Sequence, residues 1–292
     1  MKAYIFPGQA SQFEGMGKDL YESSEIVKSF FEEANEILGY RISDTMFNGS
    51  MEELSKTEIT QPAVFLHSIA KIKLIGDSYK PDMVAGHSLG EFSALTSAGA
   101  LSWQDGLRLV HKRAIAMQKA CELQPSAMAA ILGLDDEVVE GVCNEIEDYV
   151  IPANYNCPGQ LVISGSKKGV ANAVDRLNGV GAKRAIMLPV SGAFHSKYML
   201  PAQNELAEAI ESIEISNPFC PIFQNFTASG VKIASEIKEN LIKQLTAPVK
   251  WTQTMKEMIK YGATEFIEVG GTGKTLQGFV KKLDRSIPTS AL

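Results

Sequence analysis

Hydrophobic residues recur along this chain in two alternating patterns, and the alternation predicts an α/β fold. The short apolar runs that predict buried strands lie at 3–6, 83–85 and 265–269. The segments predicted to be helices lie at 26–38, from about 60, at 107–121, 206–213, 237–245 and 254–261. Strands that alternate with helices favour a largely parallel sheet with helices on both faces.

The order of the elements changes between residues 125 and 189. The predicted order there is strand, helix, strand, strand, helix and strand, at 128–132, 137–146, 149–153, 161–164, 169–177 and 184–188. This is the order of a ferredoxin-like unit. We therefore predict an α/β-hydrolase-like catalytic domain formed by 1–124 and 190–292, which a ferredoxin-like subdomain at 125–189 interrupts.

The composition excludes several classes of protein. A chain of 292 residues can bury a core without disulfides or a structural metal. Its net charge of −6 offers no overall attraction to nucleic acid or to an anionic membrane, and no apolar run reaches the ~18 residues of a membrane span. The four cysteines lack metal-ligand spacing. We therefore expect a cytoplasmic protein with reduced thiols, no metal or other cofactor, and no nucleic-acid or membrane partner.

The clearest chemical signal is the G-x-S-x-G motif formed by residues 86–90. It lies where a predicted strand meets a predicted helix, which is the context of a nucleophile elbow. In such a turn the serine, here Ser88, sits at a helix N-terminus, where backbone N–H groups can stabilise an oxyanion. A chance match in a loop is the competing interpretation.

A serine nucleophile needs a base, and the chain offers four histidines. His67 and His111 lie in helical patterns, where a structural histidine is the commoner case. His87 adjoins Ser88, and a sharp elbow would splay their side chains apart. His195 follows a glycine-containing loop between a predicted strand and a helix, where catalytic residues collect. We therefore predict that His195 is the base, although no acidic partner for it is evident.

Two other features carry weaker signals. Arg113 lies at the edge of an apolar helical stripe and has the chemistry to clamp a carboxylate, but a structurally paired arginine is the commoner case. The segment 268–275 ends in Gly-Lys-Thr, yet its first residue is Glu268, where the P-loop motif requires glycine. We therefore disfavour nucleotide hydrolysis.

Several motifs together identify a family. They are Phe6-Pro7-Gly8-Gln9, Ser11-Gln12, Gly15-Met16-Gly17, Thr60-Gln61-Pro62-Ala63, Gly86-His87-Ser88-Leu89-Gly90-Glu91, Arg113 with Met117, Asn156 with Pro158-Gly159-Gln160, Gly192-Ala193-Phe194-His195-Ser196, and Gln244 before Pro248-Val249 and Trp251. With these motifs the chain closely resembles, over nearly its whole length, the malonyl-CoA:acyl carrier protein transacylases of type II fatty acid synthesis. Two departures concern Ala10, where the family usually has glycine, and the turn at 270–273, which is one residue longer.

The resemblance implies an acyltransferase with a ping-pong mechanism. Ser88 would attack the malonyl thioester, His195 would accept its proton, and the phosphopantetheine thiol of acyl carrier protein would then take the malonyl group from the serine ester. The resemblance further implies that the backbone N–H groups of Gln9 and Leu89 form the oxyanion hole. The backbone carbonyl of Gln244 would orient the histidine.

The resemblance also implies how the acyl group is held. Arg113 would bind the malonyl carboxylate, which reverses the expectation drawn from its residue type alone. The other residues implied at the acyl pocket are Asn156, Met117 and Phe194, and the Ala193-Phe194-His195 sequence is similar to that of malonyl-selective members.

Alternatives to this function remain at the level of the sequence. A serine thioesterase or esterase would share Ser88 and His195, a docking module would retain the site without activity, and the carrier could serve polyketide synthesis. The partners expected are malonyl-CoA and acyl carrier protein, with the chain a monomer. Two basic clusters are candidates for carrier docking: Lys274, Lys281, Lys282 and Arg285, or Lys183 and Arg184.

Overall fold

A computed structural model of the chain describes residues 1–190 and 192–292, so Ser191, at the start of the predicted histidine loop, lies outside the described residues. The larger of two sheets has the strand order β10-β9-β1-β2-β7-β8. Its strands are β1 (Lys2–Phe6), β2 (Met83–Gly86), β7 (Ile222–Phe223), β8 (Gly230–Val231), β9 (Glu265–Glu268) and β10 (Thr289–Ala291). Only β8 is paired in the antiparallel sense, which confirms the predicted, largely parallel sheet.

Helices cover both faces of this sheet, as the alternation of elements predicted. They are α1 (Lys18–Ser23), α2 (Glu25–Leu38), α3 (Ile42–Asn48), α4 (Met51–Leu54), α5 (Thr57–Ile75), α6 (Gly90–Ser97), α7 (Trp103–Leu123), α10 (Leu200–Glu211), α11 (Ala234–Lys243), α12 (Trp251–Tyr261) and α13 (Thr275–Leu283). Short 3₁₀ turns lie at Gly76–Ser78, Lys197–Met199 and Gln244–Thr246.

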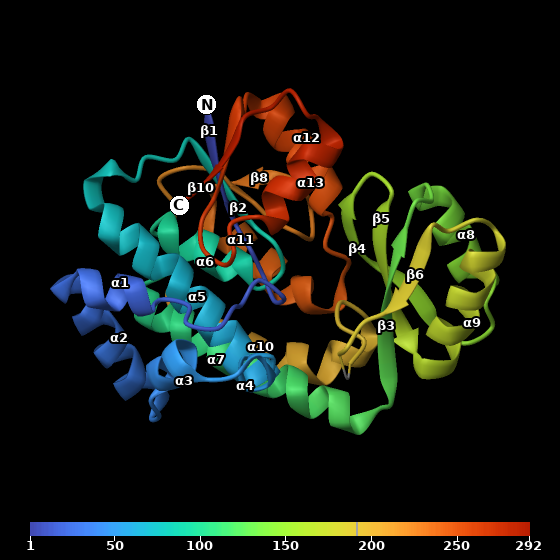
Figure 1. Ribbon diagram of the computed structural model, residues 1–292, viewed down its shortest axis with the longest axis horizontal. Coiled ribbons are helices and arrows are strands. Elements are labelled where there is room, and N and C mark those ends of the chain that lie inside the picture. The colour runs from blue at the N-terminus through green and yellow to red at the C-terminus, as the bar shows by residue number, and fades with distance from the viewer. Residues whose placement is uncertain (191) are drawn as a thin grey trace.

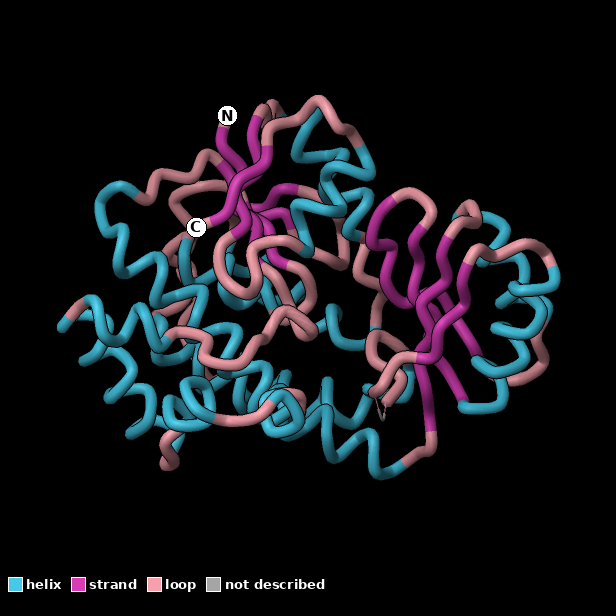
Figure 2. Tube along the Cα trace, viewed as in Figure 1, coloured by secondary structure: helices cyan, strands magenta, loops and turns pink. Residues whose placement is uncertain are grey.

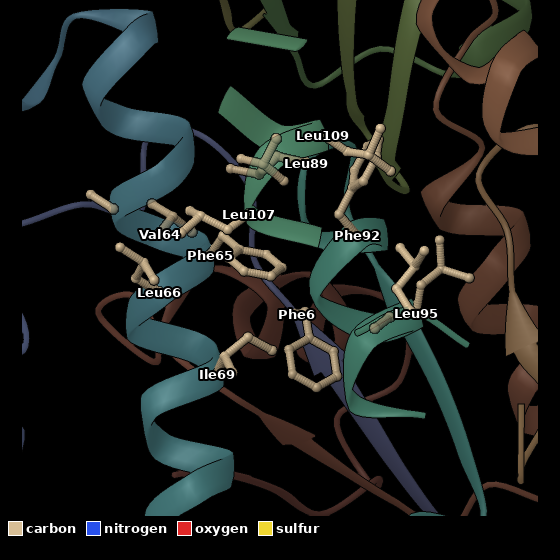
Figure 3. Close-up of a cluster of buried hydrophobic side chains, with 14 of the residues drawn as sticks. Phe6, Val64, Phe65, Leu66, Ile69, Leu89, Phe92, Leu95, Leu107 and Leu109 are labelled. Carbon is tan, nitrogen blue, oxygen red and sulfur yellow. The ribbon is translucent and has the colours of Figure 1, made fainter. Parts of the chain in front are cut away.

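Strand β1 shows why both faces are covered. Successive side chains of a strand point to opposite faces, and here both sets are buried. Tyr4 and Phe6 belong to one hydrophobic cluster, with residues of α2, α5, α6 and α7, whereas Ala3 and Ile5 belong to another, with residues of α12 and α13. Figure 3 shows Phe6 between the helix that carries Ile69 and the helix that carries Leu95.

The segment predicted to be an insertion forms a second sheet at the other end of the molecule (Figure 1). Its strands are β3 (Ser126–Leu132), β4 (Val150–Cys157), β5 (Gln160–Ser166) and β6 (Arg184–Met187), all antiparallel in the order β4-β5-β3-β6. Helices α8 (Asp136–Glu145) and α9 (Lys167–Gly179) cover its outer face (Figure 2). This confirms the predicted fold class, an α/β domain with an inserted ferredoxin-like subdomain. The boundaries at 125 and 189 stay a prediction.

Backbone hydrogen bonds join the small sheet to the large domain at a point distant in sequence from the two segments where the chain passes between them. Val249, just before α12, donates to the carbonyl of Ala153 at 2.8 Å and accepts from the N–H of Tyr155 at 2.9 Å. Strand β4 also packs against α12 and α13. Because the two sheets are tied together here, residues from both can line one site.

Within 1–190 and 192–292, no helix is both long and apolar enough to cross a membrane. Over the same residues, no three His, Cys, Asp or Glu side chains gather as they would around a metal ion.

Candidate active site

The predicted strand, turn and helix around Ser88 are confirmed. Strand β2 ends at Gly86 and α6 begins at Gly90, and Ser88 between them has a left-handed backbone with φ of 52°. A Cβ atom on Gly86 would lie 1.9 Å from the carbonyl carbon of Gly90, and one on Gly90 would lie 2.1 Å from the carbonyl oxygen of Phe6. Since neither position tolerates a side chain, the two glycines are what allow so tight a turn.

Ser88 and His195, which are 107 residues apart in the chain, meet in the structure. Ser88 Oγ lies 2.8 Å from His195 Nε2. The other ring nitrogen, Nδ1, faces the carbonyl oxygens of Gln244 and Ala247, each at 3.1 Å. Because a carbonyl only accepts, Nδ1 carries the proton and Nε2 is the atom that accepts from the serine. Two backbone carbonyls therefore accept the Nδ1–H of His195, in the position that an Asp or Glu carboxylate would otherwise take.

The environment of His195 keeps its ring neutral. Burial and the nearby charge of Arg113 lower the pKa of His195 to about 3. A neutral imidazole is the form that can accept a proton from Ser88 Oγ. His195, like Ser88, has a left-handed backbone, with φ of 56°. Non-glycine residues in this conformation cluster at functional sites, because surrounding contacts must hold them there.

The other three histidines do not contact Ser88. His67 Nδ1 accepts from the backbone N–H of Gly271, and His111 packs edge-on against Tyr40. His87 Nε2 lies 2.8 Å from Asn156 Oδ1, with its ring against Trp251. The His87 ring therefore bonds to Asn156, and it is His195 that hydrogen-bonds to Ser88 Oγ.

Arg113 approaches the same serine from α7. Its side chain is buried, with Nη2 2.9 Å from Ser88 Oγ and Nη1 2.7 Å from Gln61 Oε1. Burial lowers the pKa of Arg113 to about 10, which leaves it charged at neutral pH. Its Nε has no hydrogen-bond partner, and none of the ion pairs formed within 1–190 and 192–292 includes it. A buried cation with a free donor suits an anionic ligand.

Two backbone N–H groups beside Ser88 are unused. Leu89 is the residue that precedes α6, where helix N–H groups lack partners within the helix. In the part of the chain that the structure describes, neither Leu89 nor Gln9 donates a backbone hydrogen bond. The adjacent Ala10 has a φ of 74°, in the region that favours glycine. This explains why glycine suits that position.

These residues line one small cavity of about 140 Å³ between the two sheets. Its walls are Gln9, Ala10, His87, Ser88, Leu89, Arg113, Met117, Met128, Asn154, Val162, Leu188, Val190, Phe194 and His195. The cavity includes Met117 and Phe194 among the predicted acyl-pocket residues. Asn156 is not among the lining residues, but its Oδ1 lies 2.8 Å from Nε2 of His87, which does line the cavity, so a role for Asn156 in acyl binding stays a prediction. Asn154, two residues before it, lines the cavity directly.

Sequence reasoning missed several polar residues around the site. Gln61 holds Arg113, and the side chain of Gln244 donates to the backbone carbonyl of Ser88 at 3.0 Å. Glu91 is fully buried and accepts from the backbone N–H of Asn225 at 2.7 Å. Burial raises the pKa of Glu91 to about 7, while these hydrogen bonds and Arg113 oppose the rise. Gln61 and Glu91 lie inside recognised motifs, but Asn225 carried no signal.

The glycine turn at 270–273 does not form a phosphate site. Gly271 packs on Ser11, where an added Cβ would approach the Ser11 Cβ to 2.7 Å. Glu268, the last residue of β9, is buried, and its carboxylate accepts from the N–H of Gln277 in the first turn of α13 at 3.0 Å. A carboxylate therefore already occupies the helix N-terminus that a phosphate would need, and this agrees with the rejection of the P-loop.

Comparisons with known proteins agree with this geometry. Residues 3–290 match the family model described as acyl transferase domain. The chain is 45% identical to the malonyl CoA-acyl carrier protein transacylase of Bacillus subtilis (strain 168), over 99% of this chain and 92% of that protein.

Solved structures give the same result. The malonyl CoA-acyl carrier protein transacylase of Coxiella burnetii superposes with a TM-score of 0.95 at 37% identity, covering 100% of this chain and 93% of that one. A malonyl-transacylase in complex with its type II PKS acyl-carrier protein superposes with a TM-score of 0.94 at 38% identity, covering 99% and 94%. A match along nearly the whole chain, in both sequence and fold, places this protein in the acyl transferase domain family.

Proposed function

We propose that this protein transfers a malonyl group from malonyl-CoA to the phosphopantetheine thiol of acyl carrier protein, through a malonyl ester of Ser88. The observation that carries the proposal is the position of Ser88 Oγ, 2.8 Å from the base nitrogen of His195 and 2.9 Å from the buried guanidinium of Arg113. A nucleophile, a base and a carboxylate-binding cation thus meet at one atom. The names of relatives up to 45% identical support the same substrates.

In the first half of the reaction, Ser88 Oγ attacks the thioester carbonyl carbon as His195 Nε2 accepts the hydroxyl proton. The negative charge that develops on the carbonyl oxygen would be stabilised by the N–H groups of Gln9 and Leu89, each worth about 3–4 kcal/mol. When the C–S bond breaks, His195 returns the proton to the CoA thiolate. The malonyl ester of Ser88 remains.

The second half runs these steps in reverse with another thiol. The pantetheine thiol gives its proton to His195 and attacks the ester carbonyl. As the C–O bond to Ser88 breaks, His195 Nε2 returns the proton to Ser88 Oγ, which restores the free hydroxyl and the neutral base. Since both halves exchange an acyl group between similar partners, one base suffices for both. The carbonyls of Gln244 and Ala247 would stabilise the imidazolium formed in each half.

The acyl pocket supports selection of a short acid. Arg113 lies at the polar end of the cavity, while Met117 and Phe194 contribute apolar walls. A malonyl carboxylate would pair with the guanidinium and take up its free donor. An acetyl group would leave the buried charge without a partner.

The carrier itself would dock on a basic hollow between the two domains. Lys183, just before β6, Arg184 of β6 and Lys282 of α13 line one hollow of about 320 Å³. None of the three takes part in an ion pair within the described ranges. Cys157 lines the same hollow and follows Asn156, which contacts the elbow residue His87. Acyl carrier proteins are typically acidic, so a basic surface suits their approach.

We further propose fatty acid synthesis as the pathway, in the cytoplasm, with the chain acting as a monomer. Its four cysteines are free and buried, and one chain supplies every residue of the site. Loading of a polyketide carrier is the second candidate, favoured by the likeness to the type II PKS complex. Loading rates with carriers of both kinds separate the two.

Intact-mass analysis after brief incubation with malonyl-CoA tests the reaction. We expect a malonyl adduct that is absent from Ser88→Ala, persists without carrier and disappears as pantetheinylated carrier gains mass. Release of CoA with no lasting adduct and no loaded carrier would identify a thioesterase or esterase instead.

A further inference from the structure

A fully buried polar cluster lies beneath the elbow and has no part in the chemistry described above. It consists of Glu91, in the first turn of α6, and Gln224 and Asn225, just after β7. All three side chains are completely shielded from solvent. Burial of so many polar atoms is unfavourable unless each is hydrogen-bonded, so their arrangement calls for a structural or functional reason.

Asn225 bonds to the elbow on both sides of His87. Its Oδ1 accepts from the backbone N–H of Ser88 at 2.6 Å, and its Nδ2 donates to the backbone carbonyl of Gly86 at 2.6 Å. One planar amide therefore satisfies a donor and an acceptor at a fixed spacing. Among side chains of this size, only asparagine offers both groups.

Glu91 fixes Asn225 in turn. Its Oε2 accepts from the backbone N–H of Asn225 at 2.7 Å, and its Oε1 accepts from Gln224 Nε2 at 3.1 Å. Since Glu91 lies three residues after Ser88, the contacts close a ring from the elbow through Asn225 and back to α6. Both partners of the carboxylate are donors, so an amide in its place would set its NH₂ group against one of them.

From these contacts we propose that Asn225 is a positioning residue for acyl transfer, which holds the backbone of Ser88 in its reactive conformation, and that the Glu91 carboxylate locks Asn225 in place. The proposal rests on the function proposed above. Ser88 has a left-handed backbone, which a non-glycine residue keeps only when neighbouring contacts enforce it. Release of the Ser88 peptide would displace its Oγ from His195 and turn the adjoining Leu89 N–H.

The first test is Asn225→Ala, with Asn240→Ala as its matched control. Asn240 is also a buried amide, but it donates to Gln224 at 2.9 Å and does not contact the elbow. For Asn225→Ala we expect kcat to fall about 10- to 100-fold with KM for malonyl-CoA little changed, because a small displacement of reacting groups reduces rate rather than binding. For Asn240→Ala we expect a comparable loss of thermal stability with kcat retained.

A second measurement does not depend on the acyl substrate. Phenylmethylsulfonyl fluoride modifies activated serines, and we expect it to inactivate Asn225→Ala about 10-fold more slowly than the wild type. If the wild type reacts with this reagent but forms no malonyl adduct, the proposed function fails while the role of Asn225 is still measured. Should Asn225→Ala fail to fold, Asn225→Asp keeps the acceptor for Ser88 but sets an oxygen against the Gly86 carbonyl, and the same slow inactivation is expected.

The third variant pair concerns Glu91. In Glu91→Gln the NH₂ group of the new amide would face either the Asn225 N–H or Gln224 Nε2, both of which are donors. We therefore expect a loss of kcat similar to that of Asn225→Ala. Glu268→Gln is the control, because Glu268 is equally buried, its Oε1 has no hydrogen-bond partner, and an amide can keep the bond from the Gln277 N–H through its oxygen. Equal kcat in Asn225→Ala and Asn240→Ala, or in Glu91→Gln and Glu268→Gln, would overturn the proposal and make the cluster purely structural.

Discussion

Arg113 Nη2 lies 2.9 Å from Ser88 Oγ, on an oxygen that His195 Nε2 also contacts at 2.8 Å. One hydroxyl is therefore shared by a buried cation and a neutral base. Burial is the main cause of the lowered pKa of His195 and the charge of Arg113 is the second, so a substrate carboxylate that pairs with the guanidinium would offset only the second cause. This relationship links recognition of the acyl group to activation of the nucleophile.

The role of Arg113 can be tested by substrate preference. In Arg113→Ala we expect kcat/KM for malonyl-CoA to fall about 10²-fold or more, because loss of one partner of a buried charge pair costs about 3 kcal/mol or more. The value for acetyl-CoA should change far less. Arg108→Ala, on the exposed side of the same helix, is the control. An unchanged ratio of malonyl to acetyl would remove the basis of the malonyl assignment.

His195 should be the base for both halves of the reaction. We expect His195→Ala to slow acylation of Ser88 by about 10²- to 10⁴-fold, as measured by rapid release of CoA. The same factor should apply to transfer onto the carrier, because one base serves both steps. His111→Ala, which removes a histidine packed on Tyr40, should retain the wild-type rate. Wild-type acylation by His195→Ala would require a different base.

The two glycines of the elbow should be far more sensitive than a helical glycine elsewhere. In Gly90→Ala the new methyl would lie 2.1 Å from the Phe6 carbonyl oxygen, so we expect a loss of several kcal/mol in unfolding free energy. Gly141→Ala, in α8, meets nothing within 4 Å and should gain about 0.5–1 kcal/mol. Denaturant unfolding measures both, and a Gly90→Ala protein of normal stability would show that the turn is looser than described.

Acid should destabilise the protein through His67. Burial lowers the pKa of His67 from 6.5 to about 4, so between these values the unfolded chain binds a proton that the folded chain does not. The group's full contribution is therefore present above pH 6.5 and is lost as pH falls toward 4, at about 1.4 kcal/mol per pH unit. In His67→Gln the unfolding free energy should fall less steeply over this range, with a constant difference from the wild type above pH 7. Parallel curves down to pH 4 would contradict the assignment.

Carrier docking is tested by reversal of charge. For the double change Arg184→Glu and Lys282→Glu we expect KM for carrier to rise at least about 10-fold, since like charges across an interface cost several kcal/mol. Malonyl-CoA kinetics should stay unchanged, because the pair lies outside the acyl cavity. The double change Lys28→Glu and Lys260→Glu, at exposed lysines of α2 and α12 outside the hollow, alters the net charge equally and is the control. An equal loss for both substrates would argue against this surface.

Local patterns along the chain were enough to predict most of the fold. The spacing of hydrophobic residues predicts the order of strands and helices. The ferredoxin-like unit follows from that order alone, because its elements are consecutive in the chain. The two-residue strands β7 and β8 escaped prediction, since so short a run has no periodicity. Helix α13 also escaped prediction, although Leu276, Val280 and Leu283 recur at helical spacing there.

The candidate site was predicted where a residue type or motif carries its own chemistry. Ser88 and His195 fall in this group, whereas Arg113 was assigned to the site only through the family resemblance, because its residue type alone favoured a structural arginine. The acid sought for His195 was absent because Gln244 and Ala247 act through backbone carbonyls, which any residue possesses. Asn154 and Asn156 would share a face in a regular strand, but the pairing of β4 with β5 is irregular on both sides of them, and one lines the cavity while the other contacts His87.

By itself, the sequence determined the alternation of elements, the inserted unit, the elbow and the identity of the reactive groups, because these depend on neighbours within a few residues. Only the tertiary structure decided which groups meet. The contacts of Ser88 with His195, Arg113 and Asn225 span 107, 25 and 137 residues. Asn225 reaches Ser88 because β7 pairs with β2, and Arg113 reaches it because α7 packs against α6. Local spacing does not specify such long-range pairing and packing.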